Sequence, residues 1–572
     1  MELLELDNSS YSDIWEKVRE KLRERADWWS HRELSDPGVT LLEMWAVLCD
    51  MQSFYLDQMQ ESHYRGYLKL LGIPPDTGSC ARVMIQFWQV AADCILPAGT
   101  RLLADTMSFE IPAEMELTAN RICGLIRGAD GYRASAMLLS RKFRLALKKS
   151  EFLFTFALEK PVQAGRRFLF FVLVDERRKR NPPIPEFSLV RLAWEYRTAH
   201  GWREAKTLKD ETYGLLYSGC VCLETDYPMT AGENGRYEIR CRVAEGEYDE
   251  MPTLYKISLN AVEAVQKDTR CCQEYGAFSQ ECGRAEMQSY LAKTGEIRVF
   301  AEQGEGFWKE ITDRCRIEPP IAAEGQSRYV YFQGDARVKF VCSGEGFEEE
   351  YGPCPIAGVT GQRIQLPWKN ILRDSVELML AQDESGLYRE YRRTEPEEIR
   401  VDNAWHWDER ENEIVLGDGR HGDIPPACEK GLLLTSLALF EGEQGNVSIG
   451  RVRRLEKKEL FPKISCSNLL AGVGGRTPQS PSEQFKRVGE ALGQINRIVT
   501  KEDAEKLAVR TPGLRVRSAR AQWQDNKLKV TIFPGVSLEE YCREQYRKAA
   551  EQYLEQYRLA GMGISVETAE GE

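Results

Sequence analysis

The stretch Asp36-Pro37-Gly38-Val39-Thr40-Leu41-Leu42-Glu43 predicts the start of a long amphipathic helix. Thr40, followed three residues later by Glu43, has the pattern of a capping box with Thr40 as the N-cap. Apolar residues then recur at helical spacing until Gly72 and the following prolines end the run. We expect one stripe of this helix to face a partner; its members are Leu41, Trp45, Leu48, Met51 and Tyr55.

A second helix is expected upstream, from Ser12 to about Trp29. The apolar stripe of the longer helix could serve an ordinary core within the chain. However, the first 75 residues or so offer only this one companion helix, and a helix pair buries little apolar surface on its own. The pattern therefore favours packing against helices of another subunit.

From Ala81 onward the apolar period changes to two, since Val83, Ile85 and Phe87 alternate with other residues. Short strands separated by Gly, Pro, Asn and Asp turns are expected over about 125–400, as in sandwich or barrel modules. The segment Leu192–Tyr196 leading to Gly201–Glu204 is similar to Gly306–Glu310, which suggests about two such modules.

Beyond about residue 460 the pattern becomes helix, strand, strand, helix, strand, which predicts a small two-layer α+β domain. The expected fold class is therefore multidomain α+β, with N-terminal helices and a β-rich core carrying inserted β-sandwich-like modules. The expected domains are 1–78 (helical), 79–125 with 410–460 (β core), 126–409 (inserted modules) and 461–572 (C-terminal α+β).

The composition of the 572 residues argues against several classes of protein. The net charge of −12 argues against a nucleic-acid partner, because phosphate binding needs a basic face. The acidic N-terminus does not resemble a signal peptide, and no apolar run approaches the roughly 20 residues of a membrane helix. We expect a protein made and assembled in the cytoplasm, without membrane insertion. The 16 cysteines lack the paired spacing of zinc sites and are expected to be reduced.

The most suggestive polar cluster is Asp418, His421 and Asp423, which could bind a metal or transfer protons. The glycines around it favour a structural turn instead, because Gly and Asp supply unusual backbone angles. We assign the turn to Gly417, Asp418, Gly419 and Gly422. The sequence predicts no catalytic, cofactor-binding or metal-binding residue, and no cofactor.

Several motifs occur in the order found in one family. They are Asp36–Glu43, Tyr67–Pro74, Leu96-Pro97-Ala98-Gly99-Thr100, Ile414–Pro426, Gly445-Asn446-Val447, Gly474-Gly475 and Arg497–Asp503. Together they resemble the phage baseplate J-like family, and Trp194–Leu215 resembles its "putative baseplate assembly protein" branch, found in contractile injection systems and phage-tail-like particles. Leu416 stands where the family usually has Phe.

The resemblance implies a structural wedge subunit rather than an enzyme. Its N-terminal helices would join a second wedge subunit, and its C-terminal domains would link neighbouring wedges into a ring around the tube. Sheath-initiating and hub baseplate proteins are further implied partners, and rearrangement of the ring would be coupled to sheath contraction.

An alternative from the residues themselves is a carbohydrate-binding or carbohydrate-active β-protein. Its binding faces would be the aromatic segments, with Trp194, Tyr196 and Trp202 as the candidates.

Overall fold

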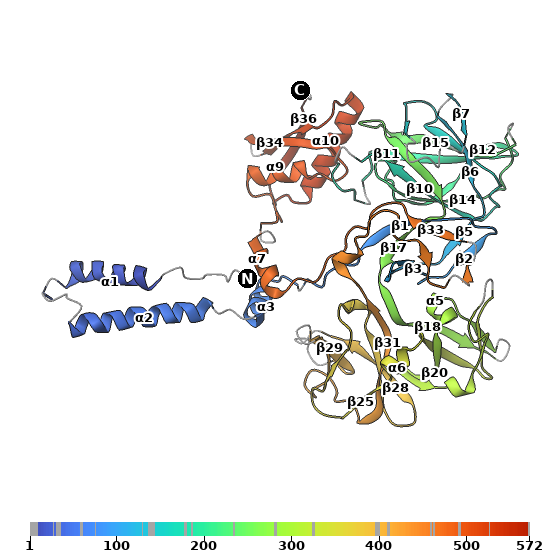
Figure 1. The fold of residues 1–572 in the computed structure, drawn as a ribbon. Coiled ribbons are helices and arrows are strands. Elements are labelled where there is room, and N and C mark those ends of the chain that lie inside the picture. Colours follow the sequence, from blue (N-terminus) through green and yellow to red (C-terminus); the bar gives the residue numbers. More distant parts are fainter. Residues whose placement is uncertain are drawn as a thin grey trace. The chain divides into compact units, whose positions relative to one another are not determined.

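The computed structural model shows a β-rich α+β chain with helices at its N-terminal end (Figure 1). It describes residues 10–569 except 27, 30–35, 58–60, 75, 128–129, 135–143, 177–179, 185–186, 233–234, 280–282, 323–325, 395–400, 409–411, 458–459, 462–463, 490–492 and 525–526. The chain divides into two compact units, one of residues 1–78 with 478–494 and one of residues 79–477 with 495–572. The expected α+β class is confirmed.

The first unit is helical. Its described elements are α1 (Tyr11–Arg25), α2 (Pro37–Asp57), α3 (Glu61–Leu70) and α7 (Pro481–Lys486). Tyr64 and Leu68 of α3 are buried, and the ring of Phe485 from α7 lies 5.4 Å from that of Tyr64. A segment some 400 residues downstream thus completes the packing of α3.

The predicted end of the helical run at Gly72 is confirmed, although the run consists of two helices, α2 and α3, and residues 58–60 lie outside the described residues. Gly72 has φ +68°, its N–H bonds to the Lys69 carbonyl at 3.0 Å, and the Ile73 N–H bonds to the Leu68 carbonyl at 2.9 Å. These two bonds form a Schellman motif, in which glycine adopts the left-handed conformation without a Cβ clash.

The expected N-cap at Thr40 is wrong. Helix α2 already begins at Pro37, and the Asp36 carboxylate accepts a 2.7 Å hydrogen bond from the Gly38 N–H. Asp36 is therefore the N-cap, with proline at the first helical position, where its missing N–H costs nothing. Thr40 lies inside the first turn and donates its hydroxyl to the Asp36 carbonyl at 3.2 Å.

The second unit is built around a six-stranded sheet, here called the core sheet. Its strands, in order, are β32 (Arg454–Leu455), β3 (Arg101–Ala104), β4 (Met107–Glu110), β17 (Ala261–Gln266), β1 (Arg82–Trp88) and β33 (Ser465–Asn468). The alternation predicted for β1 is confirmed, because Val83, Ile85 and Phe87 are buried. Beside this sheet, β2 (Cys94–Leu96) pairs with β5 (Met115–Leu117).

The first β-module, residues 122–259, consists of two facing sheets. One has the order β13 (Lys206–Asp210), β14 (Gly219–Glu224), β10 (Arg167–Val174), β16 (Thr253–Leu259), β8 (Leu145–Ala146). The other has the order β12 (Gly201–Glu204), β11 (Val190–Thr198), β15 (Tyr237–Gly246), β9 (Phe154–Leu158), β6 (Ile122–Arg127), β7 (Asp130–Ala134). Trp194 lies between the sheets, with its ring 5.0 Å from that of Phe170 in an edge-on arrangement.

The second β-module, residues 268–440, contains an eleven-stranded sheet. Its strands are β21 (Phe307–Glu310), β20 (Glu296–Gly304), β24 (Ala336–Ser343), β18 (Asp268–Phe278), β31 (Cys428–Leu439), β27 (Glu377–Ala381), β28 (Leu387–Arg393), β29 (Ala404–Asp408), β30 (Glu413–Leu416) and β26 (Arg363–Gln365), with β25 (Cys354–Ile356) beside β31. A three-stranded sheet of β19 (Arg284–Glu286), β23 (Tyr329–Tyr331) and β22 (Arg316–Glu318) and the short helices α5 (Tyr290–Thr294) and α6 (Phe347–Glu350) complete it. Of the stretch 410–460 assigned to the core in the sequence analysis, β32 lies in the core sheet, whereas β30 and β31 pair inside this module.

The C-terminal domain has the predicted order of elements. These are α9 (Lys501–Val509), β34 (Val516–Gln524), β35 (Lys527–Pro534), α10 (Glu540–Glu555) and β36 (Gly563–Thr568). The two consecutive strands form a hairpin, with β34 antiparallel to β35, and β36 is parallel to β35. Its buried residues join those of the first β-module in one continuous hydrophobic cluster, so the two share a core.

A buried polar network lies in this shared core. The Arg180 guanidinium of the first module contacts the Asp249 carboxylate at 2.7 Å, with side chains only 3% and 0% exposed. The hydroxyl of Tyr546 from α10 donates to the other Asp249 oxygen at 2.6 Å, and Arg180 also donates to the Gly513 carbonyl at 2.8 Å. Burial by itself raises the pKa of Asp249, but the hydrogen bond and charge of Arg180 hold it below its ordinary value.

Candidate partner-binding surface

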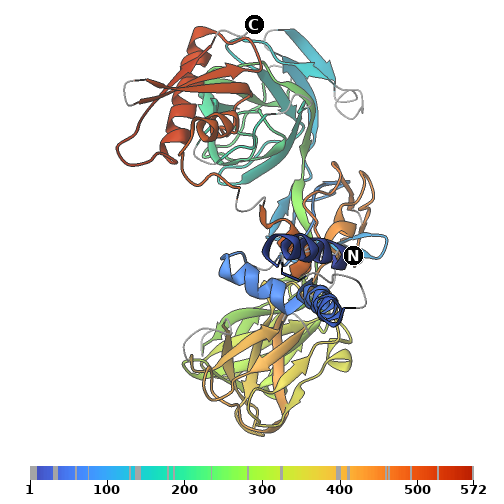
Figure 2. The same cartoon turned by 90° about the vertical axis from the view of Figure 1, so that its left-hand side faces the viewer.

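The helices α1 and α2 lie side by side as a hairpin, drawn in blue in Figures 1 and 2. In α1 the less exposed residues recur at helical spacing, at Ile14, Trp15, Val18 and Leu22. In α2, Val39 and Ala46 are buried. These spacings place one face of each helix in the hairpin.

The entry to α2 is held by Trp29. Its indole N–H donates to the Asp36 carboxylate at 2.9 Å, and its ring lies over Gly38. A Cβ at Gly38 would come within 2.2 Å of that ring, so only glycine allows this approach. The Asp-Pro-Gly sequence thus supplies the cap, the first helical residue and the space for the tryptophan.

The remaining arc of α2 is apolar and exposed. Leu41 is 58% exposed, Trp45 66%, Leu48 50% and Met51 47%. Exposure of these four side chains is what the sequence analysis expected, whereas their role in an interface stays a prediction. The side chain of Tyr55, the fifth predicted member, lies outside the described residues.

Three further apolar side chains belong to this arc and were not singled out from the sequence. They are Met44, Val47 and Phe54, all exposed. The signal was present, because the helix is apolar nearly all round, which is unusual for a helix with solvent on one side. Here the name "α2 face" denotes the set Leu41, Met44, Trp45, Val47, Leu48, Met51 and Phe54.

Charge divides the two helices. From Leu41 to Phe54, the two charged residues of α2, Glu43 and Asp50, are only partly exposed, and every more exposed position is uncharged. The exposed surface of α1 is dense in charge instead, with Glu16, Lys17, Arg19, Glu20, Lys21, Arg23, Glu24 and Arg25. A monomer rarely leaves so large an apolar surface open to water, so the α2 face is a candidate for a protein–protein contact.

The glycine cluster after β30 forms a tight turn. Gly419 has φ +81°, and its N–H bonds to the Gly422 carbonyl at 2.8 Å. The Asp418 carboxylate accepts from the His421 and Arg420 N–H groups, each at 2.7 Å, and its second oxygen lies 3.0 Å from the His421 ring nitrogen. These bonds, led by that from the His421 N–H, hold the pKa of Asp418 below its ordinary value.

Close packing also requires glycine at Gly417 and leaves little room for a side chain at Gly422. A Cβ at Gly417 would lie 2.2 Å from the Asp423 carbonyl oxygen, and one at Gly422 would lie 3.2 Å from that of Ala404. The carboxylate of Asp418 is occupied by backbone donors of its own turn. The turn assignment of these residues remains a prediction, which the following substitution tests.

Replacing Gly419 by valine is expected to destabilise the second β-module by about 1–3 kcal/mol, because a β-branched residue is strained at this φ. Hydrogen exchange of peptides covering β29 and β30 measures the change. Gly344→Val is the matched control, since Gly344 is in the same module, has no left-handed φ, and a Cβ there would meet the Arg270 carbonyl oxygen only at an ordinary contact distance of 3.8 Å. Equal stability of the Gly419→Val and wild-type proteins would contradict the structural role.

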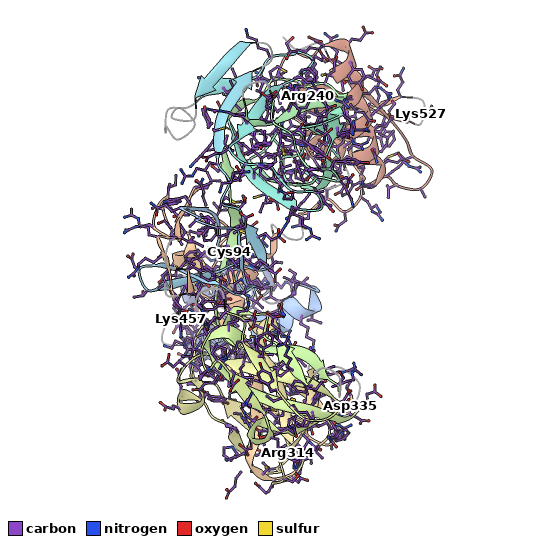
Figure 3. The ribbon with its side chains drawn as sticks, turned by 90° about the vertical axis from the view of Figure 1, so that its right-hand side faces the viewer. Cys94, Arg240, Arg314, Asp335, Lys457 and Lys527 are labelled. Atoms are coloured by element: carbon purple, nitrogen blue, oxygen red, sulfur yellow. The ribbon has the colours of Figure 1, made fainter. Side chains whose placement is uncertain are left out.

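The aromatic residues considered for carbohydrate binding are not gathered on a surface. Trp194 is fully buried in the first β-module, as is Tyr196, and Trp308 is buried in the second. Trp202 is partly exposed, but the guanidinium of Arg240, labelled in Figure 3, lies 4.1 Å from the centre of its ring. These side chains serve the packing of the modules.

Two further observations concern the described part of the chain. No group of three or more His, Cys, Asp or Glu residues there is arranged to hold a metal ion. None of the helices described combines the length and the apolar character needed to cross a membrane.

Residues 10–66 match the family model described as bacteriophage baseplate protein, N-terminal domain. No curated protein matches the chain. Two solved structures are similar: the type VI secretion system TssK-TssF-TssG baseplate subcomplex (8% identity, TM-score 0.38, 93% of this chain and 96% of that chain) and the anti-feeding prophage (AFP) baseplate (10% identity, TM-score 0.29, 98% of this chain and 70% of that chain). At these TM-scores neither similarity bears on the role of this chain, whereas the family match covers the hairpin that carries the α2 face.

Proposed function

We propose that this chain is a structural subunit of the baseplate of a contractile, phage-tail-like particle, and that it catalyses no reaction. The observation that carries the proposal is the exposed, uncharged α2 face, which lies within the segment matching the N-terminal domain of bacteriophage baseplate proteins. In this role the chain is a wedge subunit assembled in the cytoplasm, and the α2 face docks on a second wedge subunit.

Helices are the partner element that best fits this surface. A helix pair whose longer member is apolar on its open side is an incomplete bundle, and one or two further helices would complete it. Large side chains such as Trp45 and Leu48 would fill the grooves between partner side chains. Burying each of them contributes about 1.5–3 kcal/mol, enough for a stable contact when several act together.

A second contact joins neighbouring wedges into the ring through the C-terminal domain. The support from the structure is exposed aromatic surface on that domain, where Trp523 of β34 and Tyr541 of α10 are each 53% exposed. Such a contact can be weak in each copy, because closure of a ring multiplies it. Sheath-initiating and hub proteins are the remaining partners in this proposal, and rearrangement of the ring is coupled to contraction.

The proposal is tested by imaging particles from producing cells whose chain carries Trp45→Glu with Leu48→Glu. Two buried carboxylates without partners would oppose docking by several kcal/mol, so closed baseplates should fall by about 100-fold or more. A second arm carries Trp523→Glu, for which complexes with the second wedge subunit should persist while closed rings are lost.

The matched control is Lys21→Glu, which changes the exposed charged surface of α1 and should leave particle numbers unchanged. Circular dichroism and gel filtration of each purified chain establish that it is folded. Normal numbers of closed baseplates from the folded Trp45→Glu, Leu48→Glu chain would overturn the assignment of the α2 face.

A further inference from the structure

Two cysteines lie opposite each other on adjacent strands of the second β-module. Cys272 of β18 and Cys342 of β24 are register partners on adjacent antiparallel strands. Directly opposed residues of such strands have Cα atoms about 4.5–5.5 Å apart, within the range of about 4.4–6.8 Å that a disulfide spans. No other strand pairing in the described part of the chain places two cysteines opposite each other.

The two thiols differ in environment. Cys342 is fully buried in the hydrophobic cluster of the module, whereas Cys272 packs at the margin of that cluster and keeps some exposure. The Cys272 sulfur also lies 3.8 Å from the Ser289 hydroxyl, which caps the N-terminus of α5. A small oxidant therefore reaches Cys272 first.

The pair is also polarised. A hydrogen bond from the Cys342 thiol lowers the pKa of Cys272, against the opposing effect of burial. The same bond and burial raise the pKa of Cys342. The other described cysteines with a shifted pKa, such as Cys271 and Cys466, are shifted upward by burial. Cys272 is thus the better nucleophile of the pair.

We propose that Cys272 and Cys342 are a redox site that closes to an intramolecular disulfide when the protein meets a peroxide. The Cys272 thiolate attacks one oxygen of hydrogen peroxide, forms a sulfenic acid and releases hydroxide. The Cys342 sulfur then attacks the sulfenic sulfur, the S–S bond forms and water leaves. Overall, two thiols and one hydrogen peroxide give one disulfide and two waters, the thiol protons ending in the water.

The bond would brace the module where it leaves the core sheet. Strand β18 begins at Asp268, and the Thr269 N–H beside it donates to the buried Glu110 carboxylate of β4 at 2.7 Å. A cross-link from Cys272 to β24 shortens the free chain in the unfolded module and so disfavours its unfolding. Cytosolic reductants would keep the pair open, and an oxidising medium would close it.

The test exposes the purified full-length chain to hydrogen peroxide, blocks remaining thiols by alkylation and digests it without reduction. Mass spectrometry should find the peptides of Cys272 and Cys342 linked, two hydrogens lighter than their sum and separated by dithiothreitol. The link should persist in Cys466→Ser, which removes a buried cysteine of the core sheet, and vanish in Cys272→Ser. Because Cys271 is adjacent, fragmentation of the linked peptide must place the bond at Cys272.

Cys342→Ser removes the resolving thiol, so a sulfenic-acid probe such as dimedone should label Cys272 in that variant several-fold more than in the wild type. If Cys342→Ser does not fold, the loss of the link in Cys272→Ser still tests the proposal. Cys272 lies at the margin of the core, so we expect this variant to fold. Failure of the wild-type chain to form the link, or a link through Cys271 instead, would overturn the proposal.

Discussion

Replacing Asp249 by alanine is expected to destabilise the shared core of the first β-module and the C-terminal domain by about 3–5 kcal/mol. The carboxylate is fully buried and pairs with Arg180 at 2.7 Å while accepting from the Tyr546 hydroxyl. Alanine would leave the Arg180 guanidinium, itself nearly without exposure, as an uncompensated buried charge. The free energy lost is the desolvation penalty of an unpaired buried charge, which is larger than the net stabilisation that the intact ion pair provides.

Hydrogen exchange with mass spectrometry measures this effect region by region. In peptides from β15, β34 and α10, the free energy of opening should fall by about 3–5 kcal/mol. Peptides from the second β-module serve as an internal reference. Glu245→Ala is the matched control, because its pairing with Arg191 spans 3.8 Å between side chains more than 70% exposed. Such a surface pair contributes about 0–1 kcal/mol. Equal protection in the Asp249→Ala and control chains would show that the network does not stabilise the packing of the C-terminal domain on the first β-module.

Deleting residues 495–572 is expected to leave the first β-module unable to remain soluble. The deletion removes 17 of the 45 buried residues of a common hydrophobic cluster, including Leu507, Val530 and Tyr546, and exposes the residues against which they pack. It also removes backbone partners, since the Asn181 N–H bonds to the Leu514 carbonyl at 3.1 Å and the Gly513 N–H to that of Pro182 at 3.2 Å. Soluble yield should fall by about tenfold or more, with aggregates in gel filtration.

A full-length chain carrying Trp523→Glu is the control for this deletion, because that residue is exposed and its substitution should leave yield unchanged. A monomeric, cooperatively folding chain that ends at residue 494 would contradict the shared core. The proposed contact between neighbouring wedges must therefore be tested by surface substitutions, since a truncation would confuse lost contact with lost folding.

Local patterns along the chain were sufficient for its secondary structure in several places. The alternation of Val83, Ile85 and Phe87 marked β1, Gly72 marked the end of α3, and the order of helices and strands after residue 500 was correct. Each of these depends on interactions within a few residues, which the sequence carries directly. One local error, the cap at Thr40, arose because Asp36 and Thr40 both fit the preference for an N-cap, and the packing of Trp29 over Gly38 accompanies the earlier start.

The candidate surface divides in the same way. An apolar helix was evident from residues 41–55, and the sequence alone indicated that it could face a partner. Which side of α2 is covered depends on α1, so the exposed set including Met44, Val47 and Phe54 required the tertiary structure. The contrast between the charged surface of α1 and the uncharged α2 face is evident only from the structure, in which the two helices pack against each other.

Sequence by itself determined the α+β class, the N-terminal helices, the run of short strands and the terminal α+β order, because hydrophobic period and turn residues act over a few positions. Only the tertiary structure decided that β17 returns to the core sheet, that α7 packs on α3, and that Arg180 and Asp249 meet Tyr546 in a core shared between distant segments. The physical reason is that these contacts join residues hundreds of positions apart. Burial of matching apolar surfaces and pairing of buried charges select them, and neither leaves a periodic signal in the chain.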